Sequence, residues 1–133
     1  MFDKIYQVLF CQVKFYQDIY PHMLSLGEYI RELREEAEWP QRKLAYELDI
    51  DVSVLSRIEN ENKFPKKRVS EIIKKISQLF EKSEEELKKM YLSDEISEML
   101  LYENKYGEIL KVSEAKVQYS RQKKSVQSNL NFK

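Results

Sequence analysis

The sequence predicts an all-α protein. Only two glycines and three prolines interrupt 133 residues, and 35% of the chain is charged. Few helix breakers, together with many Glu, Lys and Leu residues, favour helices over strands. Apolar residues also recur at spacings of three and four, which is the period of an amphipathic helix. A chain of this length forms one domain, or a small domain with appended segments.

The first predicted helix lies in SLGEYIRELREEAE, which begins at Ser25. Ser25 and Glu28 have the spacing of a capping box, which satisfies the free N–H groups at a helix start. Trp39-Pro40 ends the segment, and Pro40 suits a position at the start of the next helix. Trp39, with Tyr29 and Tyr46 near it, is expected in the core. The predicted apolar stripe consists of Leu26, Tyr29, Ile30, Leu33 and Ala37.

Two short helices with a three-residue turn follow in QRKLAYELDIDVSVLSRIEN, residues 41–60. Ala45 is small enough for a close helix crossing, Ile50 supplies a buried residue in the turn, and Asp51 can cap the second helix. This spacing is typical of a helix-turn-helix, which leaves the outer face of its second helix free for the major groove of DNA. The inward-facing positions are Leu44, Ala45, Leu48, Val54, Leu55 and Ile58.

Further helices are predicted after the polar loop ENENKFP. Ser83 and Glu86, in SEEELKKM, form a second capping box at the start of another helix. The helix between the loop and this capping box has the apolar residues Val69, Ile72, Ile73, Ile76, Leu79 and Phe80.

The chain resembles the lambda-repressor-like (xenobiotic-response-element type) helix-turn-helix family over roughly residues 24–80. The resemblance implies a compact five-helix DNA-binding domain without enzymatic activity or cofactor, found in transcription regulators such as repressors. It also implies a homodimer on double-stranded operator DNA, and it permits an association with restriction-modification operons. The features that carry it are Gln41, the Leu44-Ala45 pair, Ile50, LSRIEN at residues 55–60, and Pro65.

The resemblance also implies which residues contact DNA. Chemistry supports these roles, because arginine binds guanine in a bidentate way, serine serves either base and valine contacts a thymine methyl group. Phosphate contacts then position the protein without specifying sequence. The implied base contacts are Val52, Ser53, Ser56 and Arg57. The implied phosphate contacts are Gln41, Asn60, Lys63, Lys66 and Lys67.

Several positions depart from the family pattern. Asp49 and Glu61 stand where glycines are usual, and Pro40 stands where a capping hydroxyl is usual. Asp tolerates the left-handed backbone that such a turn needs. Asp51, Glu59 and Glu61 are expected to repel phosphate. The cationic loop must therefore offset an acidic scaffold, so binding either needs two copies of the domain or is weak.

No set of residues points to catalysis or to a metal site, so an enzyme is not expected. His22 and Cys11 are the only residues of their types, and a zinc site needs several such ligands. A single cysteine cannot form an internal disulfide, which fits a reducing, cytoplasmic location. No apolar run reaches the ~18 residues of a transmembrane helix.

The C-terminal half carries an apolar stripe longer than a five-helix domain needs. Exposed stripes of this size mark interfaces, so residues 81–119 are expected to form a helical dimerisation region. The alternative is that these helices fold back on the domain's own core. Residues 120–133 have little to bury and are expected to form a flexible basic tail. The predicted dimer interface comprises Leu87, Met90, Ile96, Met99, Leu100, Ile109 and Leu110.

The predicted organisation places the helix-turn-helix domain at residues 23–80. Residues 1–22 fit neither helical nor strand period cleanly, and are either an extra dimer element or a leader that is not native. The predicted function is sequence-specific DNA binding by a homodimeric regulator, with a recognition helix at residues 52–59. The alternative is a protein-interaction module, such as an antitoxin or adaptor, whose C-terminal stripe grips a partner and whose DNA contact is secondary.

Overall fold

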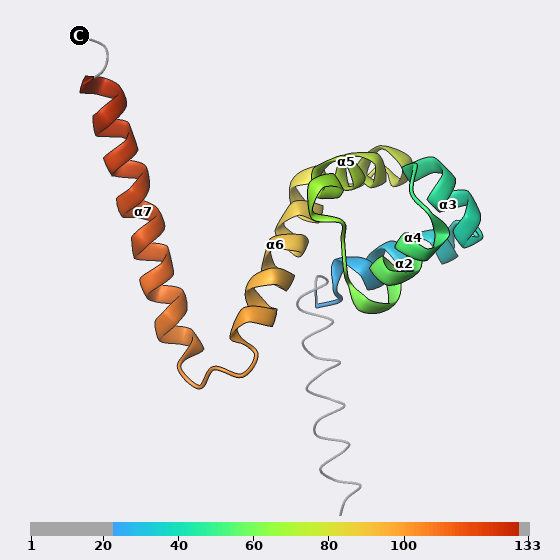
Figure 1. Cartoon of the computed structure of the whole chain (residues 1–133), viewed down its shortest axis with the longest axis horizontal. Coiled ribbons are helices and arrows are strands. Elements are labelled where there is room, and N and C mark those ends of the chain that lie inside the picture. Colours follow the sequence, from blue (N-terminus) through green and yellow to red (C-terminus); the bar gives the residue numbers. More distant parts are fainter. Residues whose placement is uncertain (1–22, 131–133) are drawn as a thin grey trace, which may run out of the picture. The chain divides into compact units, whose positions relative to one another are not determined.

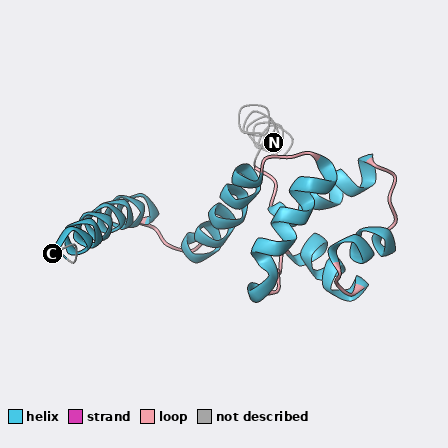
Figure 2. Cartoon of the chain, turned by 90° about the horizontal axis from the view of Figure 1, so that it is seen from above, coloured by secondary structure: helices cyan, strands magenta, loops and turns pink. Residues whose placement is uncertain are grey.

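The computed structural model describes residues 23–130, and every regular element within this range is helical (Figures 1 and 2). The all-α prediction is therefore confirmed. The helices are α2 (Leu26–Glu36), α3 (Gln41–Leu48), α4 (Val52–Glu61), α5 (Val69–Phe80), α6 (Glu84–Leu100) and α7 (Tyr106–Leu130), with a 3-10 turn at Lys66–Arg68. The predicted leader at residues 1–22, with Cys11 and His22, lies outside the described residues, as do residues 131–133.

A single apolar core joins α2, α3, α4, α5 and the first half of α6. The stripes predicted for α2 to α5 supply most of it, and burying each large aliphatic side chain stabilises the fold by about 1.5–3 kcal/mol. Ala37 does not belong to it, because α2 ends at Glu36 and Ala37 is its exposed C-cap. The core consists of Leu26, Ile30, Leu33, Leu44, Ala45, Leu48, Leu55, Ile58, Val69, Ile72, Ile73, Ile76, Leu87 and Met90.

The core extends beyond the predicted domain boundary at residue 80. Leu87 and Met90 are 1% and 3% exposed, so they are not available for the dimer interface that the sequence predicted. The alternative expectation, that the C-terminal helices fold back on the core, holds for these two residues. The compact unit that contains the motif accordingly reaches Ile96, and a second unit begins at Ser97.

The second unit is dominated by α7, a helix of 25 residues that contains no buried residue. It continues to Leu130, so residues 120–130 are helical rather than the flexible tail that the sequence predicted. The physical reason is local: no glycine or proline occurs between Glu108 and Leu130, and the helix formers Lys and Gln are frequent there. No helix within residues 23–130 is long and apolar enough to span a membrane.

The predicted cap at Ser25 forms, whereas the predicted side-chain cap at Asp51 does not. Around Ser25 the full capping box is present, with hydrogen bonds of 3.2 and 3.3 Å between the Ser25 and Glu28 side chains and backbone N–H groups. Asp49 adopts the left-handed conformation expected of it, with φ of 53°. Asp51 occupies the N-cap of α4, but its side chain makes no capping hydrogen bond. The backbone carbonyl of Asp51 instead accepts the first helical hydrogen bonds.

Helix α2 crosses α4 so closely that only glycine fits at position 27. A Cβ atom on Gly27 would lie 1.9 Å from the backbone oxygen of Ile58. The N–H of Gly27 donates to Oδ1 of Asn62 at 2.9 Å. Asn62 ends α4 in a left-handed conformation, with φ of 54°. The two helices are therefore joined both by packing and by a polar contact.

Asp94 ties α6 to the same junction. Its Oδ2 atom accepts from the backbone N–H of Leu26 at 2.8 Å and from Nδ2 of Asn62 at 3.1 Å. A carboxylate at a helix N-terminus is favoured by the free N–H groups and by the helix dipole. One side chain thus connects the start of α2, the end of α4 and the middle of α6.

Replacing Gly27 with Ala tests the close crossing. The added methyl group must push α2 away from α4, and such overpacking costs about 1–3 kcal/mol of unfolding free energy. A chemical denaturation curve measures the loss. Gly107→Ala is the matched control, because nothing lies within 4 Å of its added Cβ atom, and it should not destabilise the protein. A wild-type curve for Gly27→Ala would contradict the assigned crossing.

Candidate nucleic-acid interface

Two cations, Arg68 and Lys75, bind backbone carbonyl groups at the end of α3 and in the turn before α4. Arg68 donates to the carbonyl oxygens of Asp49 and Leu48 at 2.6 and 3.2 Å, and Lys75 donates to that of Leu48 at 3.4 Å. These groups satisfy free carbonyls at the C-terminus of α3, where the helix dipole favours positive charge. Glu71 pairs with both cations, and their hydrogen bonds, that of Arg68 first, lower the pKa of its carboxyl group. Arg68 is therefore committed to the fold.

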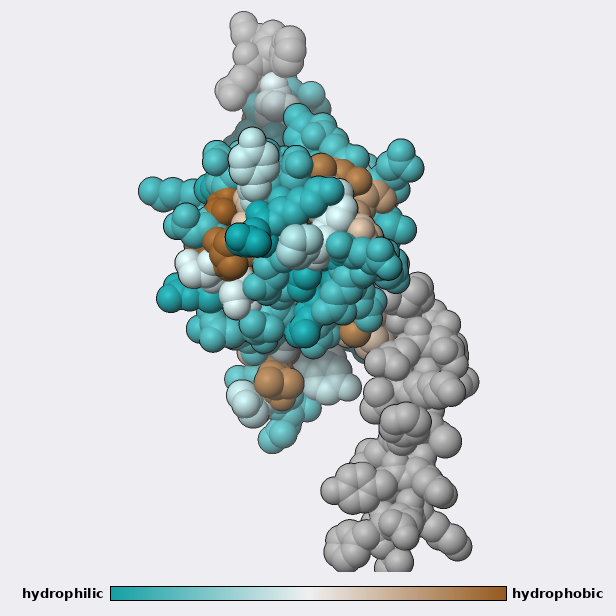
Figure 3. Space-filling view, turned by 90° about the vertical axis from the view of Figure 1, so that its right-hand side faces the viewer, coloured by the Kyte–Doolittle hydropathy of each residue, from teal (hydrophilic) through white to brown (hydrophobic). Residues whose placement is uncertain are grey.

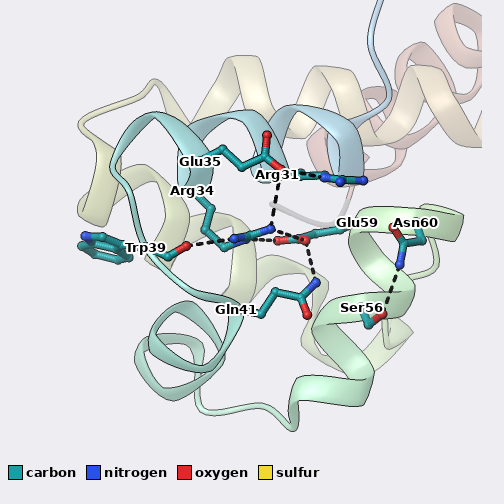
Figure 4. Close-up of polar contacts among 8 residues, drawn as sticks. All are labelled: Arg31, Arg34, Glu35, Trp39, Gln41, Ser56, Glu59 and Asn60. Carbon is teal, nitrogen blue, oxygen red and sulfur yellow. Dashed lines mark hydrogen bonds and ion pairs between the residues drawn. The ribbon is translucent and has the colours of Figure 1, made fainter.

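A buried ion pair joins α2 to α4 (Figure 4). Nε of Arg34 lies 2.6 Å from Oε1 of Glu59, and Nη2 lies 3.1 Å from Oε2. The two side chains are 11% and 1% exposed. Nη1 of Arg34 also donates to the carbonyl oxygen of Trp39 at 2.8 Å, which fixes the loop before α3. This bidentate arrangement gives the strong, directional form of an arginine–carboxylate contact.

Glu59 does not play the part that the sequence predicted. Because its carboxylate is buried and paired with Arg34, it does not face a phosphate, and the expected repulsion from this residue is wrong. Its remaining partner is Gln41, whose Nε2 donates to Oε2 of Glu59 at 2.9 Å. The amide of Gln41 carries two N–H groups, so one donor is left over at the start of α3.

The two faces of α4 differ as predicted. Leu55 and Ile58 are fully buried. Ser53 and Arg57 are exposed on the other side, and Val52 is 40% exposed. The helix thereby presents a short, mixed surface that is free of the core.

Ser56 and Asn60 contact each other on this outer face (Figure 4). Nδ2 of Asn60 donates to Oγ of Ser56 at 3.1 Å. Arg57 forms no hydrogen bond or ion pair with any residue between 23 and 130. Of the four predicted base contacts, Arg57 is therefore the longest side chain that remains available.

The basic loop after α4 is anchored by an aromatic contact that the sequence did not indicate. The ring of Phe64 packs edge-on against Tyr91 of α6, with centroids 5.5 Å apart. Lys63, Lys66 and Lys67 are exposed around this anchor. Nζ of Lys63 lies 3.9 Å from a carboxylate oxygen of Glu61, a long and exposed ion pair.

The aromatic residues around α3 divide between core and surface. Trp39 packs against Phe80 with ring centroids 5.4 Å apart, and Nζ of Lys43 lies 4.1 Å from the centre of the Trp39 ring. Tyr46 is 83% exposed, so its expected place in the core is wrong. Leu44, Ala45 and Leu48 face inward, which turns Tyr46 outward. Figure 3 views this end of the domain, where hydrophilic side chains cover most of the surface.

Substitutions at the buried ion pair should destabilise the fold strongly. Arg34→Met leaves the Glu59 carboxylate buried without its partner, and such a loss costs about 3–5 kcal/mol of unfolding free energy. Adding Glu59→Leu to Arg34→Met should recover part of this loss, because no unpaired charge then remains. Thermal and urea denaturation provide the measurement. Arg31→Ala breaks the exposed pair with Glu35 and is the matched control, which should leave the melting curve nearly unchanged.

Comparison with known proteins supports this architecture. A family model described as a helix-turn-helix domain matches residues 27–93, which is half of the chain. No curated protein and no solved structure matches the chain. The matched range begins at the second residue of α2 and ends within α6, so it includes the buried Leu87 and Met90. The chain therefore belongs to the helix-turn-helix domain family, in agreement with the lambda-repressor-like pattern of its sequence.

Proposed function

We propose that the protein is a sequence-specific DNA-binding transcriptional regulator that acts as a homodimer and inserts α4 into the major groove. The single observation that supports this most strongly is the two-sided character of α4. Its inner face is locked to the core by Leu55, Ile58 and the buried Glu59, while its outer face is exposed. A helix that is held rigidly on one side and free on the other is what groove docking requires.

Base recognition is assigned to the outer face of α4. Val52, Ser53, Ser56 and Arg57 lie along it, at spacings that keep them on one side of a helix. Arg57 can make two hydrogen bonds to guanine, and Ser53 can bond either kind of base edge. Asn60 donates to Ser56, and this hydrogen bond positions the two side chains on the same face before DNA binds.

Phosphate contact is assigned to residues at the ends of the motif helices. Gln41 is oriented by Glu59, which leaves its second N–H group for a phosphate oxygen. Asn60 lies near the end of α4, and Lys63, Lys66 and Lys67 follow on the basic loop. A lysine that neutralises a phosphate releases a condensed counterion, so these contacts make affinity depend on salt.

Dimerisation compensates for the small number of these contacts. Asp51 and Glu61 remain exposed near the docking helix, and they weaken the attraction of one domain for DNA. Two linked domains turn the second docking into an intramolecular event. With Leu87 and Met90 in the core, the dimer interface is assigned to the remaining predicted residues of α6, which are Ile96, Met99 and Leu100. Ile109 and Leu110 lie on α7 and are not assigned to it. Met99 is 77% exposed, and Ile96 is 46% exposed.

DNA-binding measurements on single variants test the assignment of α4. Arg57→Ala should cost about 1–3 kcal/mol on a selected specific site and relax discrimination at one base pair. Lys66→Ala should weaken binding to every sequence alike, and should reduce the salt slope by about one unit. Mobility shifts on sites selected from a random pool provide both readouts. Lys88→Ala, on α6, is the control, and unchanged specificity in Arg57→Ala would rule out the proposed docking.

Substitutions on α6 test the dimer. Ile96→Glu with Met99→Glu should yield a monomer by light scattering and weaken operator binding by roughly 100-fold, because the linkage between domains is lost. The melting temperature should change little, since both side chains are exposed. Leu87→Glu is the contrasting variant, which should unfold the domain because its side chain is buried. A chain that ends at Phe80 does not test the dimer by itself, because it also loses the fold contacts of Leu87, Met90 and Asp94. A full-length monomer that binds its operator tightly would contradict the homodimer.

A further inference from the structure

Helix α7 carries a regular apolar stripe, and none of the stripe's residues is buried. Residues of the stripe recur at alternating spacings of three and four, which is the a and d pattern of a coiled coil. All lie within an arc of about 100° on the helix. The five apolar members are all between 38% and 68% exposed. In order, the stripe consists of Ile109, Val112, Lys116, Tyr119, Lys123, Val126 and Leu130.

The opposite face of α7 is mainly polar, although Leu110 and Val117 also lie on it. Its other positions are Gly107, Lys111, Glu114, Gln118, Arg121, Ser125 and Ser128. A mainly solvated face opposite a regular stripe is typical of a helix whose partner packs on the stripe. In proteins, most of the stability of a helix comes from the packing of its apolar face, and α7 is 25 residues long with no buried residue. The stripe therefore has the length and spacing to pack against another helix of about three heptads.

The charge of the stripe indicates the chemistry of that partner. Lys116 and Lys123 occupy two of its seven positions, where their aliphatic stems pack and their ammonium groups need anionic partners. From Lys116 to Leu130 the basic residues Arg121 and Lys124 add to this charge, and no Asp or Glu is present. In a parallel pair of identical helices in register, Lys116 would face Lys116 and Lys123 would face Lys123. Like charges at these positions disfavour a second copy.

We propose that α7 is the docking helix for a different protein, which supplies an amphipathic helix with apolar a and d residues and with carboxylates opposite Lys116 and Lys123. DNA fits the stripe less well, because the two lysines alternate with apolar side chains that gain nothing from a phosphate backbone. This interaction does not depend on the DNA-binding function proposed above. It assigns to the C-terminal unit a role in recruiting an acidic helical partner.

A labelled peptide can represent the acidic partner. The probe spans residues 106–130 with Lys116→Glu and Lys123→Glu, so that carboxylates replace the two lysines of the stripe. The control peptide has Lys111→Glu and Lys124→Glu, which gives the same composition and net charge but leaves the stripe unchanged. In fluorescence anisotropy titrations without DNA, the probe should bind the full chain at least about tenfold tighter than the control peptide.

Variants of the full chain complete the test. Val112→Glu should abolish probe binding, whereas Gln118→Glu, on the polar face, should not change it by more than about twofold, and neither should change the melting curve of the motif domain. Equal affinity of the probe and the control peptide would overturn the proposal, because binding would then depend on net charge and not on the position of the carboxylates. Equal or tighter binding of the unmodified peptide would overturn it in favour of a second copy. A larger loss of DNA affinity in the full chain with K116E and K123E than with K111E and K124E would assign the stripe to DNA instead.

Discussion

The ion pair between Arg34 and Glu59 is the interaction on which the placement of α4 depends. Glu59 is 3% exposed, and a carboxylate at that depth is tolerated only with a cation and hydrogen bonds around it. Arg34 supplies both, and Gln41 and the carbonyl of Trp39 complete the group. Because these residues come from α2, α3, α4 and the loop before α3, the pair allows one arrangement of the helices and disfavours others.

A second polar junction extends this arrangement to α6. Asp94 accepts hydrogen bonds from the start of α2 and from Asn62, and Leu87 and Met90 bury the same helix in the core. The first half of α6 is thus part of the motif domain, although it lies beyond the residues by which the motif is recognised. A point substitution on its exposed side can therefore probe assembly without loss of the fold, whereas deletion of α6 cannot.

The zero net charge of the chain conceals a separation of roles among its charged groups. Arg34, Arg68 and Lys75 stabilise the fold through buried or half-buried contacts, and they are not available to a ligand. Arg57 and the loop lysines remain exposed, which supports DNA contact by the motif, whereas Lys116 and Lys123 of α7 lie within an apolar stripe. Local surroundings, rather than the total, decide which cation binds a polyanion.

The amino-acid sequence by itself determined the all-α class, the apolar stripes of α2 to α5, the capping box at Ser25 and the helix-turn-helix motif. Each of these depends on neighbours within one or two turns, so a local period records it. The tertiary structure alone decided that Glu59 is buried, that only glycine fits at position 27, and that Leu87 and Met90 join the core while Tyr46 does not. Those outcomes depend on residues far apart in the chain that come together only when the helices pack, and no local pattern contains that information.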